Sequence, residues 1–207
     1  MILPKIYPIT DPRLTALSHT AQVKSLIEGG AEMIQLREKT ATTDIFYADT
    51  LSAVTAAEFS KAKIIVNDRV DIALAAKAAG VHLGQDDLPP EEARRILGDD
   101  AVIGYSTHNP AQAMGAVELP IDYIAIGPVF ETSTKKNADP AVGIEGVRRV
   151  REAVKDFPIV AIGGITYDNF QEILDSGADS VAIISGILVP PKDITLTFRA
   201  FTSRVKQ

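Results

Sequence analysis

Short apolar runs rich in β-branched residues alternate with stretches of helical period along the whole chain. The helical stretches carry apolar residues three and four positions apart, as in "TAQVKSLIEGG", "RVDIALAAKAAG", "PEEARRILG", "GIEGVRRVREAV" and "NFQEILDSG". The apolar runs are typical of buried strands, namely "KIYPIT", "MIQLRE", "KIIVN", "GVHLG", "AVIGYS", "YIAIGPV", "PIVAIGG" and "SVAIISGI". The pattern therefore predicts eight strand–helix units in order.

Three junctions repeat between a helical stretch and the next apolar run: "EGGAEMI", "AAGVHL" and "DSGADSV". We expect each to place a glycine where the helix ends in the left-handed conformation. Eight parallel strands with intervening helices make a (β/α)8 TIM barrel, and no linker or low-complexity segment divides residues 1–207 into domains. An open doubly wound sheet is the alternative, but it would need fewer strands and a recognisable nucleotide-binding loop.

Composition narrows the class of protein. The chain has 207 residues, of which 46% are hydrophobic, enough to bury one substantial core. A net charge of −6 argues against a nucleic-acid-binding protein, and no apolar run is long enough for a membrane span. The absence of cysteine excludes disulfides, zinc–thiolate sites and thiol nucleophiles. We expect a cytoplasmic protein, and a homo-oligomer remains open.

Polar side chains gather where the predicted strands end. In "IQLREK", period-two alternation turns Gln35, Arg37 and Lys39 to one face, while Ile34 and Leu36 pack against helices. Barrel enzymes carry their active sites at the C-terminal ends of the strands. Singly, each of these segments could be a solvated loop, but together they predict a binding rim.

Two of the later strand ends carry carboxylates. Asn67 and Asp68 follow the third strand, Asp86 and Asp87 follow the fourth, and Ser106 ends the fifth. Asp68 and Asp87 offer two hard oxygen ligands one strand apart. Such a pair suits Mg²⁺, which completes its shell with water and substrate phosphate.

Glycines follow the last two strands. Gly163 and Gly164 in "GGI", and Gly186 beside Ser185 in "SGI", leave backbone N–H groups exposed where barrels frequently bind phosphate. Two tight turns are the alternative explanation. The sequence thus predicts a diphosphate site with magnesium and a separate monophosphate site.

The three histidines give weaker signals. His19, near the start of the first helix, is expected to be solvated, and His108 to cap the fifth helix region. His82 lies within the fourth strand and is expected to be a hydrogen-bonded interior residue rather than a base.

Seven segments in series resemble thiamine phosphate synthase across nearly the whole chain. They are "YPITD", "IQLREK", "IVNDRVDIALAAKAAGVHLGQDDLP", "IGYSTH", "IGPVFETSTKK", "VAIGGI" and "VAIISGI". The resemblance implies a transferase that joins 4-amino-2-methyl-5-pyrimidinylmethyl diphosphate to thiazole ethyl phosphate, or its carboxylate form, giving thiamine phosphate and diphosphate. It also implies a dissociative displacement, in which the thiazole nitrogen attacks with a free lone pair and needs no catalytic base.

The resemblance further implies roles for individual residues. Arg37, Ser106 and Lys135 would serve catalysis, and Asp68 and Asp87 would hold Mg²⁺. The pyrimidine diphosphate would contact Gln35, Leu36, Arg37, Glu38, Lys39, Asn67, Ser106 and Lys135. The thiazole phosphate would contact Thr132, Ser133, Thr134, Gly164, Ile184 and Ser185.

Two other functions stay open. A related barrel isomerises the thiazole phosphate, but it tends to carry histidine after the sixth-strand glycine and to lack the acidic pair. Here Pro128 follows Gly127, and both Asp68 and Asp87 are present, which favours the synthase. A noncatalytic, regulatory phosphate-binding barrel would leave the metal site without a purpose.

Overall fold

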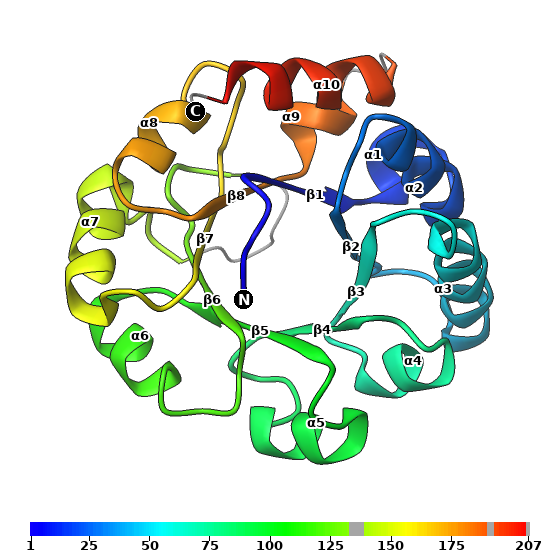
Figure 1. Cartoon of the computed structure of the whole chain (residues 1–207), viewed down its shortest axis with the longest axis horizontal. Coiled ribbons are helices and arrows are strands. Elements are labelled where there is room, and N and C mark those ends of the chain that lie inside the picture. The colour runs from blue at the N-terminus through cyan, green and yellow to red at the C-terminus, as the bar shows by residue number, and fades with distance from the viewer. Residues whose placement is uncertain (133–138, 190–192, 206–207) are drawn as a thin grey trace.

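Eight parallel strands close into a barrel in which each strand pairs with its sequence neighbours and β8 returns to pair with β1. The structure is a computed structural model that describes residues 1–132, 139–189 and 193–205. Figure 1 looks into the ring of strands and shows the helices around it. The predicted (β/α)8 barrel is confirmed. The strands are Ile6–Thr10 (β1), Met33–Leu36 (β2), Lys63–Asn67 (β3), Gly80–Leu83 (β4), Val102–Thr107 (β5), Tyr123–Ile126 (β6), Ile159–Ile162 (β7) and Ser180–Ile183 (β8).

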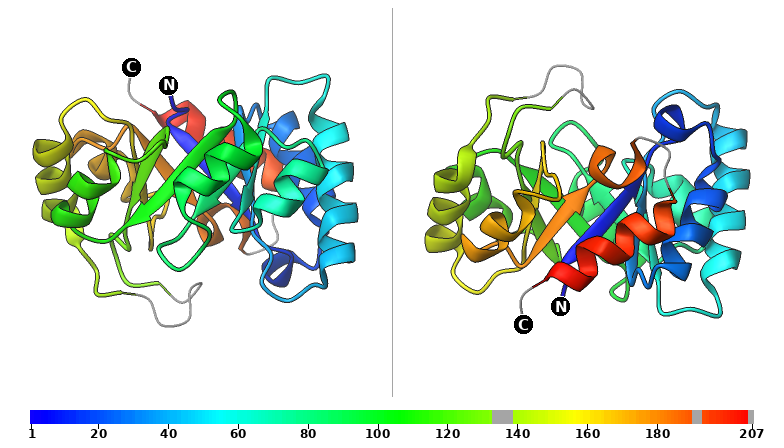
Figure 2. Two further views of the ribbon diagram at one scale, coloured as in Figure 1. Left: turned by 90° about the horizontal axis from the view of Figure 1, so that it is seen from below. Right: turned by 90° about the horizontal axis from the view of Figure 1, so that it is seen from above.

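The helices form the outer layer of the molecule (Figure 2). A short helix, α9, directly follows β8, a place where barrels often add an extra helix beside a phosphate site. Within the described ranges, no helix combines the length and the hydropathy that crossing a membrane requires. The helices are Pro12–Thr15 (α1), His19–Glu28 (α2), Thr43–Ala57 (α3), Val70–Ala75 (α4), Pro90–Leu97 (α5), Pro110–Ala116 (α6), Gly143–Val154 (α7), Phe170–Asp175 (α8), Ser185–Leu188 (α9) and Ile194–Arg204 (α10).

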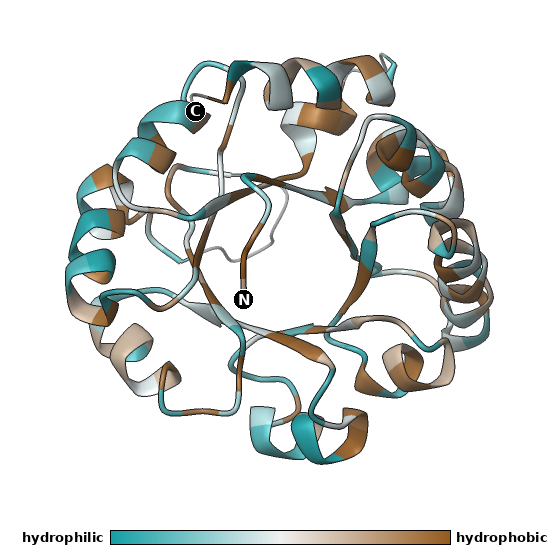
Figure 3. Ribbon diagram, viewed as in Figure 1, coloured by the Kyte–Doolittle hydropathy of each residue, from teal (hydrophilic) through white to brown (hydrophobic). Residues whose placement is uncertain are grey.

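Period-two alternation along the strands divides the apolar side chains into two cores. Ile34 and Leu36 of β2 face outward and pack in the larger core, between the strands and the helices. Met33 faces inward and packs with residues such as Tyr7 and Tyr123 in a second core inside the barrel. In Figure 3 hydrophilic and hydrophobic residues alternate along the helix ribbons, as expected of helices that cover a core. The inner core forms the floor beneath the C-terminal rim.

The glycines predicted to end helices differ in their actual roles. Gly30 and Gly177 adopt left-handed conformations with φ of +95° and +114°, as predicted. The prediction for "AAGVHL" is wrong, because Lys77 holds the left-handed position with φ of +55°. Gly80 instead begins β4, where a Cβ atom would lie 1.9 Å from the carbonyl oxygen of Val102 on the neighbouring strand. This glycine therefore permits strand packing rather than a helix end.

Candidate active site

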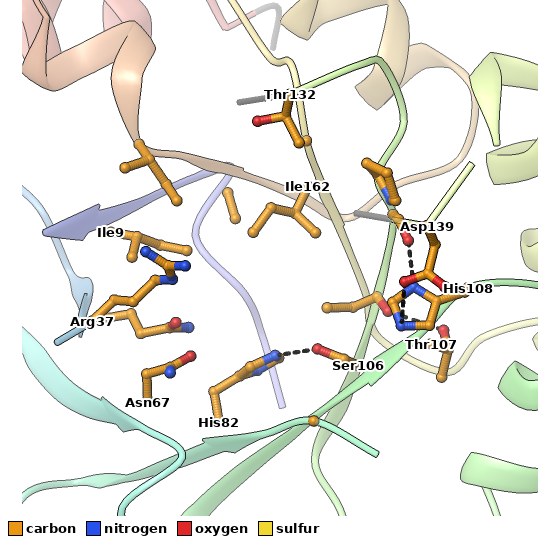
Figure 4. A pocket seen from close by; sticks show the side chains of 18 of the residues that line it. Ile9, Arg37, Asn67, His82, Ser106, Thr107, His108, Thr132, Asp139 and Ile162 are labelled. Atoms are coloured by element: carbon orange, nitrogen blue, oxygen red, sulfur yellow. Dashed lines mark hydrogen bonds and ion pairs between the residues drawn. The ribbon is translucent and has the colours of Figure 1, made fainter. Parts of the chain in front are cut away.

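A cavity of about 670 Å³ opens at the C-terminal ends of the strands. It is lined by residues that directly end or follow most of the strands, and Figure 4 shows several of their side chains around the hollow. The structure thus brings together most of the candidates named from the sequence. Those that line the cavity are Gln35, Arg37, Lys39, Asn67, Asp68, Asp87, Ser106, Thr132, Gly164, Ile184 and Ser185.

Two carboxylates and one ammonium group form the acidic part of the rim. Lys39 Nζ lies 2.5 Å from Asp68 Oδ2, and Asp87 Oδ2 accepts a hydrogen bond of 2.6 Å from the backbone N–H of Gly84. Burial, followed by the charge of Asp68, raises the pKa of Asp87. The two carboxylates therefore repel each other, and a cation bound between them would relieve that repulsion.

The donor set fits a magnesium ion. The residues that the structure describes contain no group of three or more His, Cys, Asp or Glu side chains able to enclose a metal. A cation at Asp68 and Asp87 would therefore take most of its ligands from water and substrate oxygens, and Mg²⁺ commonly binds in this way. The residues present are compatible with Mg²⁺ and unsuited to a structural zinc site, which needs four protein ligands.

Arg37 lies at the cavity wall beside a buried carboxylate. Its Nη1 donates a 3.1 Å hydrogen bond to Asp11 Oδ2, and Arg13 Nη2 lies 2.5 Å from the same oxygen. Burial alone would raise the pKa of Asp11, which is 1% exposed, but hydrogen bonds from Arg13 and the charges of both arginines hold it below its usual value. Asp11 therefore fixes one side of the Arg37 guanidinium.

Asn67 has a buried donor without a partner. The residue is 7% exposed, it lines the cavity, and among the described residues its Nδ2 atom has no hydrogen-bond partner. Buried donors are normally satisfied, so this amide is a candidate donor to a ligand or to water at the cavity wall.

Two candidates from "IQLREK" do not line the cavity. The Leu36 side chain is fully buried in the outer core, as its outward orientation predicts. Glu38 Oε1 accepts hydrogen bonds from the backbone N–H groups of Lys39, Thr40 and Ala41. Burial would raise the pKa of Glu38, but these bonds lower it to about 2. Glu38 thus holds the loop that carries Lys39.

The opposite part of the rim is built from backbone. Gly163 and Gly164 have φ of +106° and +64°, conformations that L side chains rarely adopt. A Cβ atom at Gly164 would lie 2.6 Å from Phe130 Cβ and 2.7 Å from the carbonyl oxygen of Glu131. The glycines therefore let the loop after β7 pack directly against the segment that follows β6. This packing places Thr132 and Gly164 at the same cavity.

Ser106 is hydrogen-bonded to a histidine from the strand beside it. His82 Nε2 lies 3.0 Å from Ser106 Oγ, and His82 Nδ1 lies 2.9 Å from the hydroxyl of Tyr123 (Figure 4 shows the first contact). Burial lowers the pKa of His82 to about 4, so the ring is neutral near pH 7. His82 is a satisfied interior residue, as expected from the sequence, and it also lines the cavity.

The expectations for the other two histidines are wrong. His19 is 1% exposed, with Nδ1 2.6 Å from Thr10 Oγ1, and burial lowers its pKa. His108 lines the cavity, its Nδ1 donating to the carbonyl of Gly127 at 2.6 Å. The Asn109 side chain caps α6 in its place.

Asp139 is a cavity residue that sequence reasoning missed. Its Oδ2 lies 3.4 Å from Nε2 of His108, and both side chains line the cavity (Figure 4). Asp139 lies far past the end of β6, where strand periodicity gives no signal. The end of "GYSTH" could have pointed to His108, since it directly follows the fifth strand.

Three candidates, Ser133, Thr134 and Lys135, lie outside the described residues. Their assignment to the substrates stays a prediction.

Comparisons with known proteins identify the family of this chain. The family model described as thiamine monophosphate synthase, TMP-TENI, matches residues 6–187. The thiamine-phosphate synthase of Koribacter versatilis is 43% identical over 199 residues, 92% of each chain, and that of Chloroflexus aurantiacus is 40% identical over 202 residues, 97% of this chain and 92% of the other. The solved thiamine phosphate pyrophosphorylase from Pyrococcus furiosus superposes with a TM-score of 0.87 at 37% identity, covering 96% of this chain and 94% of that one. The chain belongs to the thiamine monophosphate synthase family.

Proposed function

We propose that this protein joins 4-amino-2-methyl-5-pyrimidinylmethyl diphosphate to thiazole ethyl phosphate, giving thiamine phosphate and diphosphate. The observation that carries the proposal is the two-part rim of a single cavity in a chain of this family. One part presents Arg37, Lys39, Asp68 and Asp87, which suit a diphosphate with a cation. The other presents the glycine loop after β7 and the residues after β8, which suit a monophosphate.

Asp68 and Asp87 would hold Mg²⁺. When bound, the ion supplies positive charge that offsets the charge growing on the departing diphosphate. The paired carboxylates at the cavity support this assignment.

The residues on the donor side would align the pyrimidine and stabilise its leaving group. Asn67 offers its unpaired amide, and Arg37 and Lys39 offer charged donors to the phosphate oxygens. The bond between the methylene carbon and the diphosphate oxygen breaks, and its electron pair leaves with the diphosphate. The lone pair of the thiazole nitrogen forms the new C–N bond. Since this nitrogen carries no proton, the chain needs alignment rather than a base.

The acceptor phosphate would bind at Thr132, Gly164, Ile184 and Ser185, together with Ser133 and Thr134. The proximity of Thr132 and Gly164 around one cavity supports this part of the proposal. Both substrates are phosphorylated and cannot cross a bilayer unaided, so we place the reaction in the cytoplasm.

Product analysis tests the proposal. The purified protein is incubated with both substrates, with Mg²⁺ or with EDTA, and thiamine phosphate and diphosphate are quantified. We expect equimolar products that require Mg²⁺. Isomerisation of the thiazole phosphate without condensation would identify the related isomerase, and no turnover of either substrate would favour a regulatory barrel. Full activity in EDTA would contradict the metal assignment alone.

Replacing Gly164 by alanine is expected to raise the KM for the acceptor and to lower the melting temperature. A side chain at φ of +64° costs about 1–2 kcal/mol, and the contact with Phe130 adds to this cost. For a chain of this size each kcal/mol lowers the melting temperature by about 2–4 °C.

Gly30→Ala is the matched control for this prediction. Gly30 has φ of +95°, but a Cβ atom added there would have nothing within 4 Å, and the residue precedes β2 at the other end of the barrel. Thermal melts and acceptor titrations of both variants separate two effects: the strain of a side chain at positive φ, which both variants share, and the steric clash with Phe130, which only Gly164→Ala introduces. An unchanged acceptor KM in folded Gly164→Ala protein would mean that the loop is only a turn.

A further inference from the structure

A chain of side-chain hydrogen bonds crosses the barrel interior beneath the cavity. Gln35 Nε2 donates to the Tyr7 hydroxyl at 3.1 Å, and the hydroxyls of Tyr7 and Tyr123 lie 3.2 Å apart. The chain continues from Tyr123 to His82 Nδ1 at 2.9 Å and from His82 Nε2 to Ser106 Oγ at 3.0 Å. Both ends, Gln35 and Ser106, line the cavity, whereas the two tyrosines are at most 1% exposed.

The orientation of the Gln35 amide, with Nε2 toward the Tyr7 hydroxyl, sets the direction of this chain. Tyr7 accepts the amide proton, and its own hydroxyl proton then has one acceptor in the chain, the oxygen of Tyr123. The Tyr123 proton must in turn go to His82 Nδ1, which is therefore unprotonated. A neutral imidazole carries one proton, so it lies on Nε2 and is donated to Ser106.

The opposite direction leaves a buried group unsatisfied. If His82 donated from Nδ1 to Tyr123, then Tyr123 would donate to Tyr7, which already accepts from Gln35. The Tyr7 proton would then have no acceptor in the chain, on a phenol that is 1% exposed. An unpaired buried donor carries the full cost of its desolvation.

Neither ring nitrogen of His82 is hydrogen-bonded to a carboxylate. Its two nitrogens contact the hydroxyls of Tyr123 and Ser106. The ring of His82 also stacks on the ring of Tyr123, with centroids 5.5 Å apart and planes inclined by 25°. A charged ring buried between two hydroxyl groups would be unfavourable, although the charge of Asp68 acts in the opposite direction.

We propose that Tyr7, Tyr123 and His82 form a one-way hydrogen-bond chain that keeps His82 as the Nε2–H tautomer and so makes the Ser106 hydroxyl a donor into the cavity. Ser106 accepts from His82 and has its own proton left for a ligand. Tyr123 and His82 are then positioning residues, and Ser106 selects an acceptor atom on the substrate.

The direction of the hydrogen-bond chain excludes Ser106 as a nucleophile and indicates that its hydroxyl donates to an acceptor atom of a ligand. A serine whose oxygen accepts a proton from histidine is not being activated as a nucleophile, because activation needs the reverse arrangement. The inference rests on the proposed function in one respect: the acceptor that Ser106 would meet belongs to the pyrimidine substrate. The tautomer itself does not depend on that function.

The first experiment measures the tautomer in the ligand-free protein. Long-range ¹H–¹⁵N correlation spectra distinguish the two neutral forms of histidine, and the chain has three histidines, which single substitutions assign. We expect His82 to carry its proton on Nε2. A proton on Nδ1 would overturn the proposal.

Two tyrosine variants show whether the chain imposes this tautomer. Tyr123→Phe removes the donor to His82 Nδ1, and we expect a mixture of the two forms. Tyr7→Phe leaves the Tyr123 hydroxyl next to His82 but removes the proton that Tyr7 donates to it, so we expect a smaller shift toward the mixture. Persistence of the pure Nε2–H form in both variants would overturn the proposal. If Tyr123→Phe fails to fold, the tautomer of the unaltered protein still decides it.

The kinetic experiment asks whether Tyr123 acts through Ser106. We expect Tyr123→Phe to raise the KM for the pyrimidine substrate about tenfold, the effect of losing one hydrogen bond, while the acceptor KM changes little. In a double-mutant cycle with Ser106→Ala, the two effects should be strongly non-additive. Full additivity would mean that Tyr123 has only a structural role. A protein without synthase activity would refute the proposed function but leave the spectroscopic result valid.

Discussion

We expect replacement of Asp68 or Asp87 by asparagine to lower turnover by on the order of 100-fold or more, because each change would remove a charged oxygen ligand of the proposed Mg²⁺ at almost constant shape. The carboxylates lie together at the cavity, and the charge of Asp68 contributes to the raised pKa of Asp87. Turnover is measured with both substrates saturating, over a series of Mg²⁺ concentrations. The variants should also need more Mg²⁺ for half-maximal rate.

Melting temperatures of the variants show whether the loss of turnover comes from the lost metal ligand or from unfolding. Without metal, burial and repulsion from Asp68 disfavour the charged form of Asp87, so a neutral asparagine there should leave the metal-free protein at least as stable. Mg²⁺ should raise the melting temperature of the unaltered protein more than that of the variants, since a ligand stabilises the state that binds it.

Asp86→Asn is the matched control for the acidic pair. Asp86 is the exposed neighbour of Asp87 and lines the same cavity. Its replacement by asparagine removes the same charge. We expect a much smaller loss of turnover and little change in Mg²⁺ dependence. If Asp86→Asn matched the other two variants, general negative charge rather than a specific metal site would explain the result.

Strand periodicity accounts for the part of the site that could be predicted. Gln35 alternates inward on β2, and Asn67 and Asp68 come directly at the end of β3, so their place on the rim follows from the barrel alone. Leu36 illustrates the same rule in reverse. The resemblance named it as a substrate contact, but its alternation turns the side chain into the outer core.

Contacts between distant segments account for the errors. His19 was expected to be solvated because it lies near the start of a helix, but its ring packs against Phe46 of α3, with centroids 5.5 Å apart, and it hydrogen-bonds to Thr10 of β1. Gly80 was expected to end a helix because the local sequence contains no information about the backbone of Val102, which lies against Gly80 on the next strand. The hydrogen-bond chain through Tyr7 and Tyr123 likewise joins residues 116 positions apart. Periodicity predicts which face of a strand a side chain occupies. Its partners on other strands can be identified only from the closed barrel.

The second large effect is expected from Arg37→Lys. The guanidinium lies at the cavity wall, where one N–H group donates to the buried carboxylate of Asp11 (Figure 4 shows the cavity side). Lysine keeps the charge, but its single ammonium group cannot span Asp11 and a phosphate as the planar guanidinium can. Loss of a hydrogen bond to a charged group costs about 1.5–3 kcal/mol, so kcat/KM for the pyrimidine diphosphate should fall roughly 10- to 150-fold.

Arg13→Lys distinguishes recognition from folding, because Arg13 pairs with the same carboxylate of Asp11 but does not line the cavity. Its side chain is 39% exposed, against 12% for Arg37, and so an ammonium group can keep the pair with Asp11 while water solvates the remainder. We therefore expect kcat/KM to stay within about threefold of the unaltered protein, because the change leaves the Arg37–Asp11 pair at the cavity wall in place. Thermal melts establish that both variants are folded, and steady-state kinetics with each substrate varied in turn locate the defect. A loss for Arg37→Lys that appeared only with the thiazole phosphate would assign this arginine to the other substrate. Equal losses for both variants would mean that the pairs of Arg13 and Arg37 with Asp11 support the fold rather than diphosphate binding.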